Sequence, residues 1–490
     1  MISIHKYNES FVFIKCDLDE AINISDNFSF YADNYFWNPK YKAGIWDGKI
    51  KLFNIKTGLF PIGLFDDLIK YCKKFNVLYK IIDKELFKKG IKLSNNKIYD
   101  FNNKIFKYKH EPYDFQIKAI QLILYHKRCI ILSPTASGKS YIAFYLFNIL
   151  KYKYKDFKFL LIVPNTSLVE QMSTDFEEYA ENWCDYSKYI KKIYSGQDKS
   201  LERPITISTW QSLQNMPKKF FYDFDCVICD EGHTAKAKEL TNIMQNCINA
   251  KYKVDMSGTL QDSDIDKLQL NALFGKIYKV AKSKKLMKRG ILSNLKIFGI
   301  ILKYPKKIRE LCKKMIWKDE VDFINSREEK IRFILNILKK KNNNSLVLFK
   351  SLNFGKKMRK IFKKYLPNNR IFYVDGSILA LERERIRKYT EKHNNIIILA
   401  TFSTFSTGIN IKNLHNIFFS ESIKSSIKVI QSIGRLLRLH KSKDFAKLYD
   451  ITDDLSWKKR LNYTLKHFLH RINIYDKEDF NYSIKEIKIK

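Results

Sequence analysis

The order of apolar runs and turn-forming residues divides the chain into a short first part and a longer stretch of regular alternation. Apolar and polar residues alternate in Ser10–Cys16, which predicts a strand, and the apolar spacing of Leu18–Phe28 predicts a helix. Asp47-Gly48 is typical of a hairpin turn and precedes a predicted strand at Lys49–Phe53. The lysine- and asparagine-rich stretch Lys88–Lys109 predicts a linker. These features indicate a small α+β unit at the start of the chain.

From Pro112 onward, short apolar runs alternate with helical patterns, which indicates open parallel sheets. In the first series, strands are predicted at Ile130–Leu132, Phe159–Val163, Ile205–Ser208, Cys226–Cys229 and Lys253–Ser257. In the second series, which follows the basic segment Lys282–Arg289, strands are predicted at Leu295–Leu302, Ser345–Phe349, Arg370–Val374, Asn395–Ala400, Asn416–Phe419 and Lys447–Ile451. Helices of this series are predicted at Asn353–Tyr365, Leu381–His393 and Ile427–Leu437. We therefore expect an α/β protein with two parallel-sheet lobes, the second of which packs against the basic end Trp457–Lys490.

One stretch of the first lobe has the pattern of a phosphate-binding loop. An apolar strand ends at Leu132, a loop of small residues closes with Gly138-Lys139-Ser140, and a helical pattern follows from Tyr141 to Leu150. In such a loop the backbone N–H groups surround a polyphosphate, the lysine supplies a cation, and the serine hydroxyl binds Mg²⁺. The expected phosphate-binding residues are Thr135, Ala136, Ser137, Gly138, Lys139 and Ser140. Ser133 stands where the pattern usually has its first glycine, so the motif alone is an imperfect match.

A pair of carboxylates follows another strand of the same predicted sheet. Asp230 and Glu231 come directly after the apolar run Phe224–Cys229, about ninety residues beyond the loop. Ligands of open α/β sheets bind at the carboxyl ends of the strands, which is also where the phosphate loop begins. Asp230 is therefore expected to hold Mg²⁺, and Glu231 to polarise the water that attacks the γ-phosphate.

A third group of candidate residues lies in the lobe that has no phosphate loop. Arg435 and Arg438, within Gln431–Arg438, are three residues apart and are predicted to share one face of an otherwise apolar helix. Two arginines on a helix are commonly solvated surface residues. In a composite site they would stabilise the charge that develops on the γ-phosphate.

The net charge favours a polyanionic partner. The chain has 90 Lys and Arg residues against 51 Asp and Glu, which gives a formal charge of +39. Nucleic acid is such a partner, because lysines that contact phosphates release counterions. The chain is also rich in residues with A/T-rich codons, so genome composition is an alternative source of part of the lysine excess.

Cysteine usage and hydropathy bear on possible metal sites and on the cellular compartment. The 8 cysteines fall mostly within apolar runs, and the close pair Cys226 and Cys229 has no second ligand pair nearby, so buried thiols are favoured over a zinc or redox site. No structural metal is expected. No apolar run approaches the ~18 residues of a membrane span, and no signal-peptide pattern is present at the start. We therefore expect a cytoplasmic protein without a membrane partner.

Aromatic residues alternate with lysines near the N-terminus. This cluster comprises Phe30, Tyr31, Tyr35, Phe36, Trp37, Lys40, Tyr41, Lys42, Trp46, Lys49 and Lys51. Such residues can stack on bases and neutralise phosphates. The alternative is that the rings form the core of a small sheet while the lysines face water, and the sequence leaves both open.

These motifs together resemble those of the superfamily 2 helicases. Besides the phosphate loop, the chain has Asp230-Glu231-Gly232-His233, Ser257-Gly258-Thr259 and Gln431–Arg438 in the order and spacing of that family. The intermediate motifs are matched by Pro164-Asn165-Thr166, Ser208-Thr209-Trp210-Gln211, Leu348-Phe349-Lys350 and Ser406-Thr407-Gly408-Ile409-Asn410. The N-terminal strings Phe30-Tyr31-Ala32-Asp33, Asn38-Pro39-Lys40-Tyr41 and Trp46-Asp47-Gly48-Lys49-Ile50 are similar to a domain found in phage recombination helicases of this superfamily.

The resemblance implies two RecA-like lobes and assigns roles to further residues. Gln116 would read adenine, Gly408 and Asn410 would approach the nucleotide, and Arg435 and Arg438 would act as arginine fingers, with Gln431 beside them. His233 and Gln431 would couple the nucleotide state to closure of the lobes, and Ser257 and Thr259 would link it to the strand. Asn165, Thr166, Thr209 and Lys350 would contact the nucleic-acid backbone. Gly232 departs from the family, in which cysteine or alanine is frequent there.

The resulting expectation is an ATP- and Mg²⁺-dependent DNA helicase or translocase. Its substrates would be single-stranded or branched DNA, such as forks and Holliday junctions, and RNA–DNA hybrids, and it would work as a monomeric motor in the cytoplasm of a host cell if a phage encodes it. The expected domains are residues 1–108 for substrate recognition, 109–288 for the first lobe and 289–490 for the second. The alternatives are an RNA helicase, an ATP-switched clamp that does not unwind, and the motor subunit of a restriction-type nuclease, for which the chain shows no nuclease motif.

Overall fold

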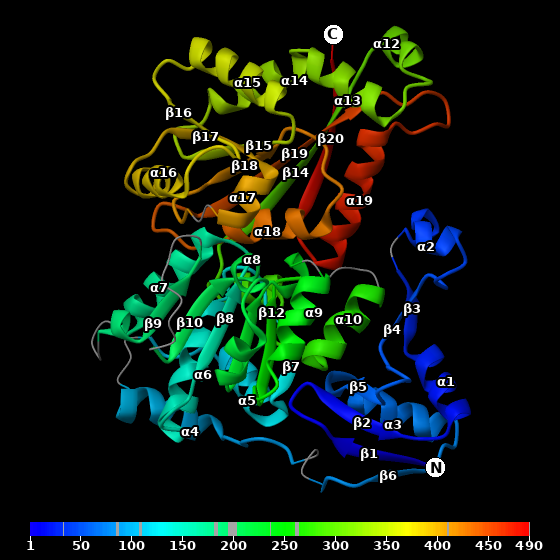
Figure 1. Cartoon of the computed structure of the whole chain (residues 1–490). Helices are drawn as coiled ribbons and strands as arrows, with labels where there is room; N and C mark the ends of the chain where they lie inside the picture. The colour runs from blue at the N-terminus through cyan, green and yellow to red at the C-terminus, as the bar shows by residue number, and fades with distance from the viewer. Residues whose placement is uncertain are drawn as a thin grey trace. The chain divides into compact units, whose positions relative to one another are not determined.

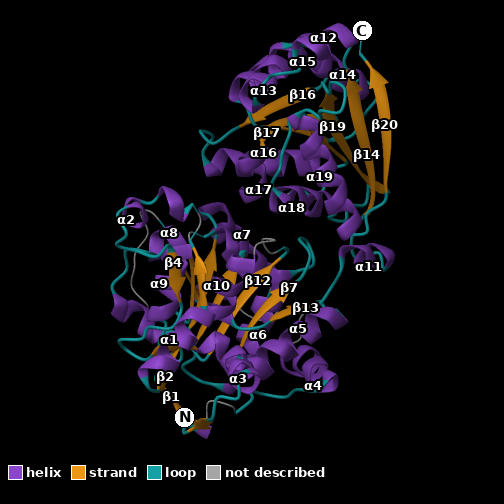
Figure 2. Ribbon diagram, turned by 90° about the vertical axis from the view of Figure 1, so that its right-hand side faces the viewer, coloured by secondary structure: helices purple, strands orange, loops and turns teal. Residues whose placement is uncertain are grey.

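The computed structural model of the chain describes residues 1–489 except residues 33, 85–87, 107–109, 181–184, 195–202, 236, 260–263 and 409–410. The described residues form two compact units, which are considered separately below (Figures 1 and 2). The first unit contains Met1–Ser133 and Gly138–Val280, and the second contains Pro134–Ser137 and Ala281–Lys490.

The first unit begins with a four-stranded mixed sheet. In spatial order its strands are β5 (Leu59–Pro61), β2 (Phe11–Lys15), β1 (Ile2–Lys6) and β6 (Tyr79–Ile81), and only the β1–β6 pair is parallel. Helices α1 (Leu18–Asn27) and α3 (Phe65–Lys74) bury their apolar faces in one cluster with the strands. The predicted strand and helix at Ser10–Cys16 and Leu18–Phe28 are confirmed.

A separate hairpin extends from this small domain. Strands β3 (Ser29–Tyr31) and β4 (Lys49–Lys51) pair antiparallel, and the short helix α2 (Pro39–Lys42) lies between them in the chain (Figure 1). Residues 29–51 are called the arm below. Its two strands form a sheet of their own, because neither pairs with the four-stranded sheet.

Buried polar contacts attach the small domain to the rest of the first unit. The Nζ atom of Lys253 donates hydrogen bonds to Ser10 Oγ (2.6 Å) and to the carbonyl oxygen of Met244 (2.9 Å), and burial lowers the pKa of Lys253 to about 7. Arg128 forms an ion pair with Glu9 at the same junction. Hydrogen bonds and an ion pair, in addition to apolar packing, therefore attach the small domain to the rest of the first unit.

The stretch predicted as a linker is partly ordered helix. Within Lys88–Lys109 the chain forms α4 (Asn95–Asp100), in which Ile98 is fully buried, followed by a π-helical turn over Phe101–Phe106. The linker prediction is wrong for these residues, because a few apolar side chains anchor an otherwise polar segment onto the core of the first sheet.

The main sheet of the first unit has seven strands, all parallel. In spatial order they are β13 (Ile277–Lys279), β7 (Arg128–Leu132), β12 (Tyr252–Ser257), β11 (Cys226–Asp230), β8 (Phe159–Val163), β10 (Ile205–Thr209) and β9 (Ile190–Ile193). The helices of this unit are α5 (Asp114–His126), α6 (Lys139–Lys153), α7 (Thr166–Tyr179), α8 (Trp210–Leu213), α9 (Ala237–Asn246) and α10 (Asp264–Phe274). They cover both faces of the sheet, as buried parallel sheets require (Figure 2).

The second unit is built on another seven-stranded parallel sheet. Its spatial order is β16 (Arg370–Val374), β17 (Ile396–Thr401), β15 (Ser345–Phe349), β18 (Asn416–Phe419), β19 (Phe445–Asp454), β14 (Asn294–Lys303) and β20 (Tyr482–Lys488). Its helices are α11 (Ser283–Lys288), α12 (Lys306–Leu311), α13 (Trp317–Ser326), α14 (Glu329–Leu338), α15 (Leu352–Tyr365), α16 (Ala380–Lys392), α17 (Phe402–Gly408), α18 (Ser426–Leu436) and α19 (Tyr463–Lys477). The predicted fold of two RecA-like parallel sheets and a small N-terminal domain is confirmed.

Two further observations concern the cysteines of β11 and the length of the helices. Cys226 and Cys229 lie buried in β11, where burial raises the pKa of both thiols well above the usual value, which fits the interpretation of the pair as core residues. Within the described ranges, no helix is both long and apolar enough to cross a membrane.

A buried ion pair fixes α19 against the second sheet. Arg471 on α19 donates two hydrogen bonds to the carboxylate of Asp450 on β19 (2.7 and 2.8 Å) and a third to the carbonyl oxygen of Ile423 (2.8 Å). Tyr475 donates to the same carboxylate (2.8 Å). Arg471 and Asp450 are both fully buried, so the three contacts hold α19, β19 and the loop after β18 in one arrangement.

We predict that Arg471→Met lowers the free energy of unfolding of the second unit by about 3–5 kcal/mol, because it leaves the Asp450 carboxylate buried without its cation. Urea or thermal unfolding of the full chain measures the change. The control is Arg385→Met, since the Arg385 side chain is 72% exposed in its contact with Glu382. Equal losses in the two variants would show that the buried pair contributes no more than a surface contact.

Candidate functional site

The loop between β7 and α6 has the backbone of a phosphate-binding turn. Two of its residues have left-handed conformations, Ala136 with φ of 68° and Gly138 with φ of 82°. The left-handed φ at position 138 favours glycine, and a Cβ there would come within 2.5 Å of Nε2 of Gln116, whose side chain would have to move. Ser133, which replaces the usual first glycine, is buried and donates its N–H to the carbonyl oxygen of Ser257 on β12 (3.0 Å). The loop is therefore anchored to the sheet even though serine replaces the usual glycine at position 133.

Lys139, the first residue of α6, lies against the two carboxylates after β11. Its ammonium forms an ion pair with Glu231 and lies 3.9 Å from Oδ1 of Asp230. The side chains of all three are about one-tenth exposed. Burial by itself would lower the pKa of Lys139, but the two carboxylates raise it above its usual value. The lysine is therefore charged and is held by the two carboxylates.

Glu231 is the centre of a hydrogen-bonded group. Its carboxylate accepts from the Ser257 hydroxyl (2.7 Å) and from the backbone N–H of Gly258 (3.2 Å), and it lies 3.5 Å from Nδ1 of His233. Burial raises the pKa of Glu231, but the neighbouring Lys139 reverses the effect and leaves it below the usual value. Glu231 is thus an ionised, buried carboxylate with fixed orientation, as required of a group that polarises water.

His233 and Thr259 meet Glu231 through the same serine. The Ser257 hydroxyl lies 3.0 Å from Nδ1 of His233, and it accepts the N–H of Thr259 (3.3 Å). Burial lowers the pKa of His233, although Glu231 opposes the shift, so the imidazole is neutral at physiological pH. The three residues expected to couple the nucleotide state to lobe closure or to the strand are therefore brought together with Glu231.

A buried acid behind Gly232 holds the turn after β11. Oδ1 of Asp255 on β12 accepts the N–H of Gly232 (2.8 Å), and a side chain at position 232 would approach that oxygen to 2.6 Å. Burial raises the pKa of Asp255 to about 7. This close approach explains why glycine stands at position 232. Asp255 was not predicted, since only the pairing of β11 with β12 reveals it.

Gln116 and Ser140, predicted to contact the nucleotide and Mg²⁺, are each held by a hydrogen bond with a neighbouring residue. Gln116 is buried on α5, and its Oε1 accepts the N–H of Tyr113 (2.9 Å), which fixes the side chain beside Gly138. The hydroxyl of Ser140 lies 2.9 Å from that of Tyr179 on α7, a partner that the sequence did not indicate. A hydroxyl at Ser140 and a carboxylate at Asp230 are the oxygen donors that Mg²⁺ prefers, so these residues fit the expected ion.

The residues expected to contact nucleic acid in the first unit lie at helix N-termini. Asn165 caps α7 by accepting the N–H of Leu168 (3.1 Å), and Thr166 is the first residue of that helix. Thr209 caps α8, is 3% exposed, and accepts the N–H of Ser212 (3.3 Å). Because β8 and β10 are neighbours, the two caps share one edge of the sheet. Their side chains have structural roles whether or not they also contact a phosphate.

In the second unit, Lys350 is exposed at the end of β15, and Gln431 and Arg435 lie on α18. Arg435 is 9% exposed, with its guanidinium 5.6 Å from the Phe405 ring centre.

The prediction that Arg435 and Arg438 share one helical face is wrong, because α18 ends at Leu436 and Arg438 follows its C-cap. The carbonyl oxygen of Arg438 accepts a hydrogen bond from Ser293 Oγ (3.0 Å). Gly408 ends α17, and Asn410 lies outside the described residues.

Three families match separate parts of the sequence. Residues 1–83 match "DNA helicase UvsW, N-terminal", residues 109–262 match "Type III restriction enzyme, res subunit", and residues 329–440 match "Helicase conserved C-terminal domain".

Whole-chain similarity is found to a phage protein. The "ATP-dependent DNA helicase uvsW" of Enterobacteria phage T4 is 34% identical over 514 aligned positions, which cover 100% of both chains. The crystal structure of T4 UvsW covers 99% of this chain and of its own, with 31% identity and a TM-score of 0.52. A "DNA 3'-5' translocase XPB2" of Sulfurisphaera tokodaii is 23% identical and covers 76% of this chain and 89% of its own. Because the phage T4 relative is similar along the entire sequence, this protein belongs to the UvsW family of ATP-dependent superfamily 2 helicases.

Proposed function

We propose that the protein is a DNA translocase that uses ATP and Mg²⁺ to remodel branched DNA, including replication forks and Holliday junctions, with RNA–DNA hybrids as further substrates. The observation that carries the enzymatic part is the buried contact of Lys139 with Glu231, held by Ser257 beside the phosphate loop. DNA is favoured over RNA because the phage and archaeal relatives reported above are a DNA helicase and a DNA translocase by name.

The geometry suggests how ATP would activate the site. A triphosphate in the loop would compete for the Lys139 ammonium, which Glu231 holds in this structure. Glu231 would then keep its contact with Ser257 through Oε2 and present Oε1, released by Lys139, to the attacking water. Ser140 and Asp230 would hold Mg²⁺, which neutralises phosphate charge when bound.

The second lobe would complete the site in this proposal. Arg435 and Arg438 would stabilise the charge on the γ-phosphate, with Gln431, Gly408 and Asn410 near the nucleotide. Closure and opening of the lobes would move the strand, and His233, Ser257 and Thr259 would transmit the nucleotide state. Contacts from Asn165, Thr166, Thr209 and Lys350 to the backbone imply little sequence preference.

We propose that residues 1–108 recognise the branch point through the arm. Its aromatic side chains are on the surface: Trp37 is 68% exposed, Phe36 48% and Tyr31 47%. Lys42 Nζ lies 5.1 Å from the Trp37 ring centre, and Lys49 Nζ lies 5.5 Å from that of Tyr31. These rings do not form a buried core, which was the alternative to a base-stacking role. Exposed rings flanked by ammonium groups are suited to unpaired bases and their phosphates.

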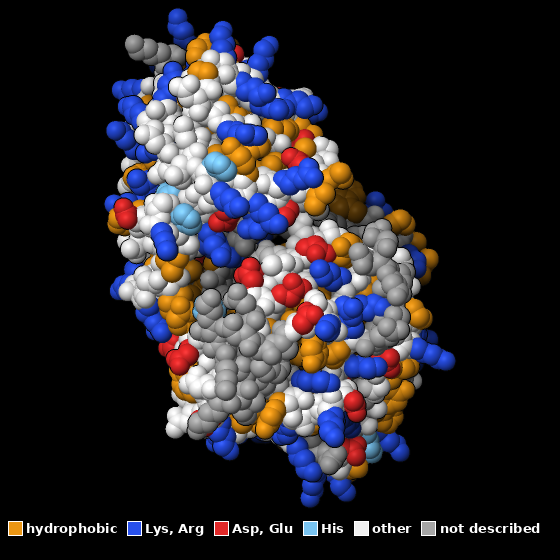
Figure 3. Space-filling model, turned by 90° about the vertical axis from the view of Figure 1, so that its left-hand side faces the viewer, with side chains coloured by type: hydrophobic (Ala, Val, Ile, Leu, Met, Phe, Trp, Pro, Cys, Tyr) orange, Lys and Arg blue, Asp and Glu red, His pale blue; other side chains and the backbone are white. Residues whose placement is uncertain are grey.

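The charge distribution supports a polyanionic partner. Figure 3 shows Lys and Arg side chains spread over one face of the second unit, with few carboxylates among them. Genome composition would explain an excess of lysine but not its separation from acidic residues on this face. The division into a recognition domain (1–108) and two lobes (109–288 and 289–490), acting as one monomer in the cytoplasm of a host cell, completes the proposal.

We predict that Lys139→Ala and Glu231→Gln each abolish DNA-stimulated ATP hydrolysis, because the first removes the phosphate-binding cation and the second the water-polarising carboxylate. Steady-state phosphate release with and without DNA measures the effect. Lys153→Ala, an exposed lysine in the last turn of the same helix α6, is the control and should retain wild-type turnover. Unchanged hydrolysis in both site variants would refute the proposed site, and stimulation by RNA alone would favour an RNA helicase.

We also predict that Trp37→Ala weakens binding to a DNA four-way junction by about 1–3 kcal/mol, the usual contribution of one base–aromatic stack. Basal ATP hydrolysis should not change, since none of the residues proposed to bind or hydrolyse ATP belongs to the arm. Fluorescence anisotropy with a labelled junction gives the affinity. The matched control is Phe75→Ala, because Phe75 is 52% exposed and Lys74 Nζ also lies 5.1 Å from its ring centre. If Phe75→Ala weakens binding as much as Trp37→Ala, the arm has no special part in recognition.

A further inference from the structure

The second unit has a pocket that the proposed ATP chemistry does not use. Its volume is about 510 Å³, and it lies at the carboxyl ends of β15, β17 and β18, the edge where open parallel sheets bind ligands. The side chains that matter for its chemistry are Trp317, Lys350, Ser422, Lys424, Lys428 and His467. Of these, only Lys350 was predicted as a functional residue.

Trp317 presents an aromatic surface in this pocket. It is the first residue of α13 and is half-buried. Its ring centre lies 4.7 Å from that of His467, at an interplanar angle of 52°, and 6.1 Å from that of Tyr463. Lys350 Nζ lies 5.9 Å from the Trp317 ring centre. The indole is therefore supported by two rings of α19 while it lines an open cavity next to a cation.

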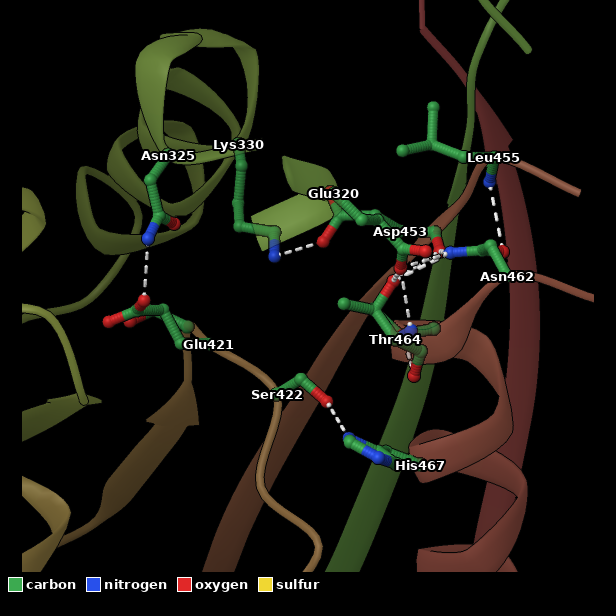
Figure 4. Close-up of polar contacts among 12 residues, drawn as sticks. Glu320, Asn325, Lys330, Glu421, Ser422, Asp453, Leu455, Asn462, Thr464 and His467 are labelled. Carbon is green, nitrogen blue, oxygen red and sulfur yellow. Dashed lines mark hydrogen bonds and ion pairs between the residues drawn. The ribbon is translucent and has the colours of Figure 1, made fainter. Parts of the chain in front are cut away.

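A buried carboxylate holds α13 and α19 together. Glu320, three residues after Trp317, is 3% exposed and accepts the backbone N–H groups of Tyr463 (2.9 Å) and Thr464 (2.8 Å) at the start of α19. It also accepts from the Asn462 amide (2.9 Å) (Figure 4). These bonds satisfy N–H groups that a helix N-terminus leaves free. The relative position of Trp317 and the rings of α19 is therefore fixed by the fold.

His467 contributes a neutral ring to the pocket. Its Nδ1 lies 3.0 Å from the hydroxyl of Ser422, in the loop after β18, and Figure 4 shows the two side chains facing each other. Burial lowers the pKa of His467, and the cations Arg471 and Lys424 lower it further. A neutral imidazole packs against an indole and leaves the binding of phosphate to the lysines.

The positive charge of the pocket is not compensated by its lining. No aspartate or glutamate lines it, and Lys350, Lys424 and Lys428 form no ion pair within the part of the chain that the structure describes. The neighbouring Glu421 is directed to other partners: its carboxylate accepts the backbone N–H groups of Lys350 (2.6 Å) and Ser351 (2.8 Å) and the amide of Asn325 (2.8 Å). Glu421 therefore orients the loop that carries Lys350 without neutralising the pocket.

We propose that this pocket binds one unpaired nucleotide of the translocated strand, with its base stacked on Trp317 and its phosphates contacted by Lys350, Lys424 and Lys428. An aromatic face beside uncompensated ammonium groups matches a base and its phosphates. Bases in a duplex are already stacked on their neighbours, so a single strand is the form that can use the indole. The inference rests on the proposed function only in taking nucleic acid as the polymer, and it adds that the second lobe grips a base as well as the backbone.

The test compares equilibrium binding of two single strands of equal length, oligothymidylate and an abasic deoxyribose-phosphate strand, to the full chain without ATP. We expect Trp317→Ala to reduce the preference for the strand with bases by about 5- to 100-fold, while affinity for the abasic strand stays unchanged. Trp317→Phe should retain most of the preference. The matched control is Tyr365→Ala, because Tyr365 is 39% exposed and also has lysines near its ring, yet does not line the pocket.

The lysines provide an independent measurement. The double variant Lys424→Gln and Lys428→Gln should weaken binding of both strands alike and reduce the slope of log affinity against log salt by about 0.7 for each phosphate that the protein no longer neutralises. An unchanged preference for bases in Trp317→Ala would overturn the inference while leaving the proposed function standing. Failure of the wild-type protein to bind either strand would instead overturn the proposed function as well.

Photocrosslinking of the wild-type protein avoids any effect of substitution on folding. A single strand that contains 5-iododeoxyuridine should crosslink to Trp317 or to its neighbour His467, and peptide mapping identifies the residue. Crosslinks confined to other parts of the chain would contradict a base in this pocket.

Discussion

The parallel alignment of all strands in both seven-stranded sheets determines where the chemistry of this protein lies. Parallel strands place all their carboxyl ends at one edge, so residues far apart in sequence come together there. In the first sheet this edge holds the loop after β7, Asp230 at the end of β11 with Glu231 after it, and Ser257 at the end of β12. In the second sheet the same edge holds Lys350 after β15 and the Trp317 pocket. In each sheet the candidate functional residues thus lie along one edge.

Compensation of buried charge distinguishes permanent contacts from exchangeable ones. Arg471 and Asp450 are fully buried and satisfied by each other, so their pairing fixes structure. Lys139 and Glu231 are also buried, but in the proposed mechanism each acts on ATP only after the ion pair between them is broken. The lysines around the Trp317 pocket differ from both pairs, since no aspartate or glutamate among the described residues lines this pocket. The charge of these lysines is available to a polyanion, whereas the charges of the buried ion pairs are not.

The alternation of strands and helices could be predicted from the sequence because buried parallel strands form continuous apolar runs. Shorter or more exposed elements could not: β6 contains only three residues, and β20 is a mostly exposed edge strand. Candidate residues for the ATP site could be proposed from the sequence because a motif of adjacent residues indicates them. Asp255, Tyr179 and Trp317 were missed because their importance comes from contacts between distant segments, which no local pattern records. The helix predicted at Ile427–Leu437 is observed at Ser426–Leu436, so Arg438 lies beyond it and the spacing of the two arginines did not place them on one helical face.

The central claim is that ATP hydrolysis in the first lobe drives movement along DNA. The most direct measurement is strand displacement by the wild-type protein on a forked DNA, with ATP and, in parallel, with a non-hydrolysable analogue. The account predicts displacement with ATP and none with the analogue, although the protein binds the fork in both conditions. Displacement that proceeds equally well with the analogue, or binding of the fork without any ATP-dependent displacement, would contradict it.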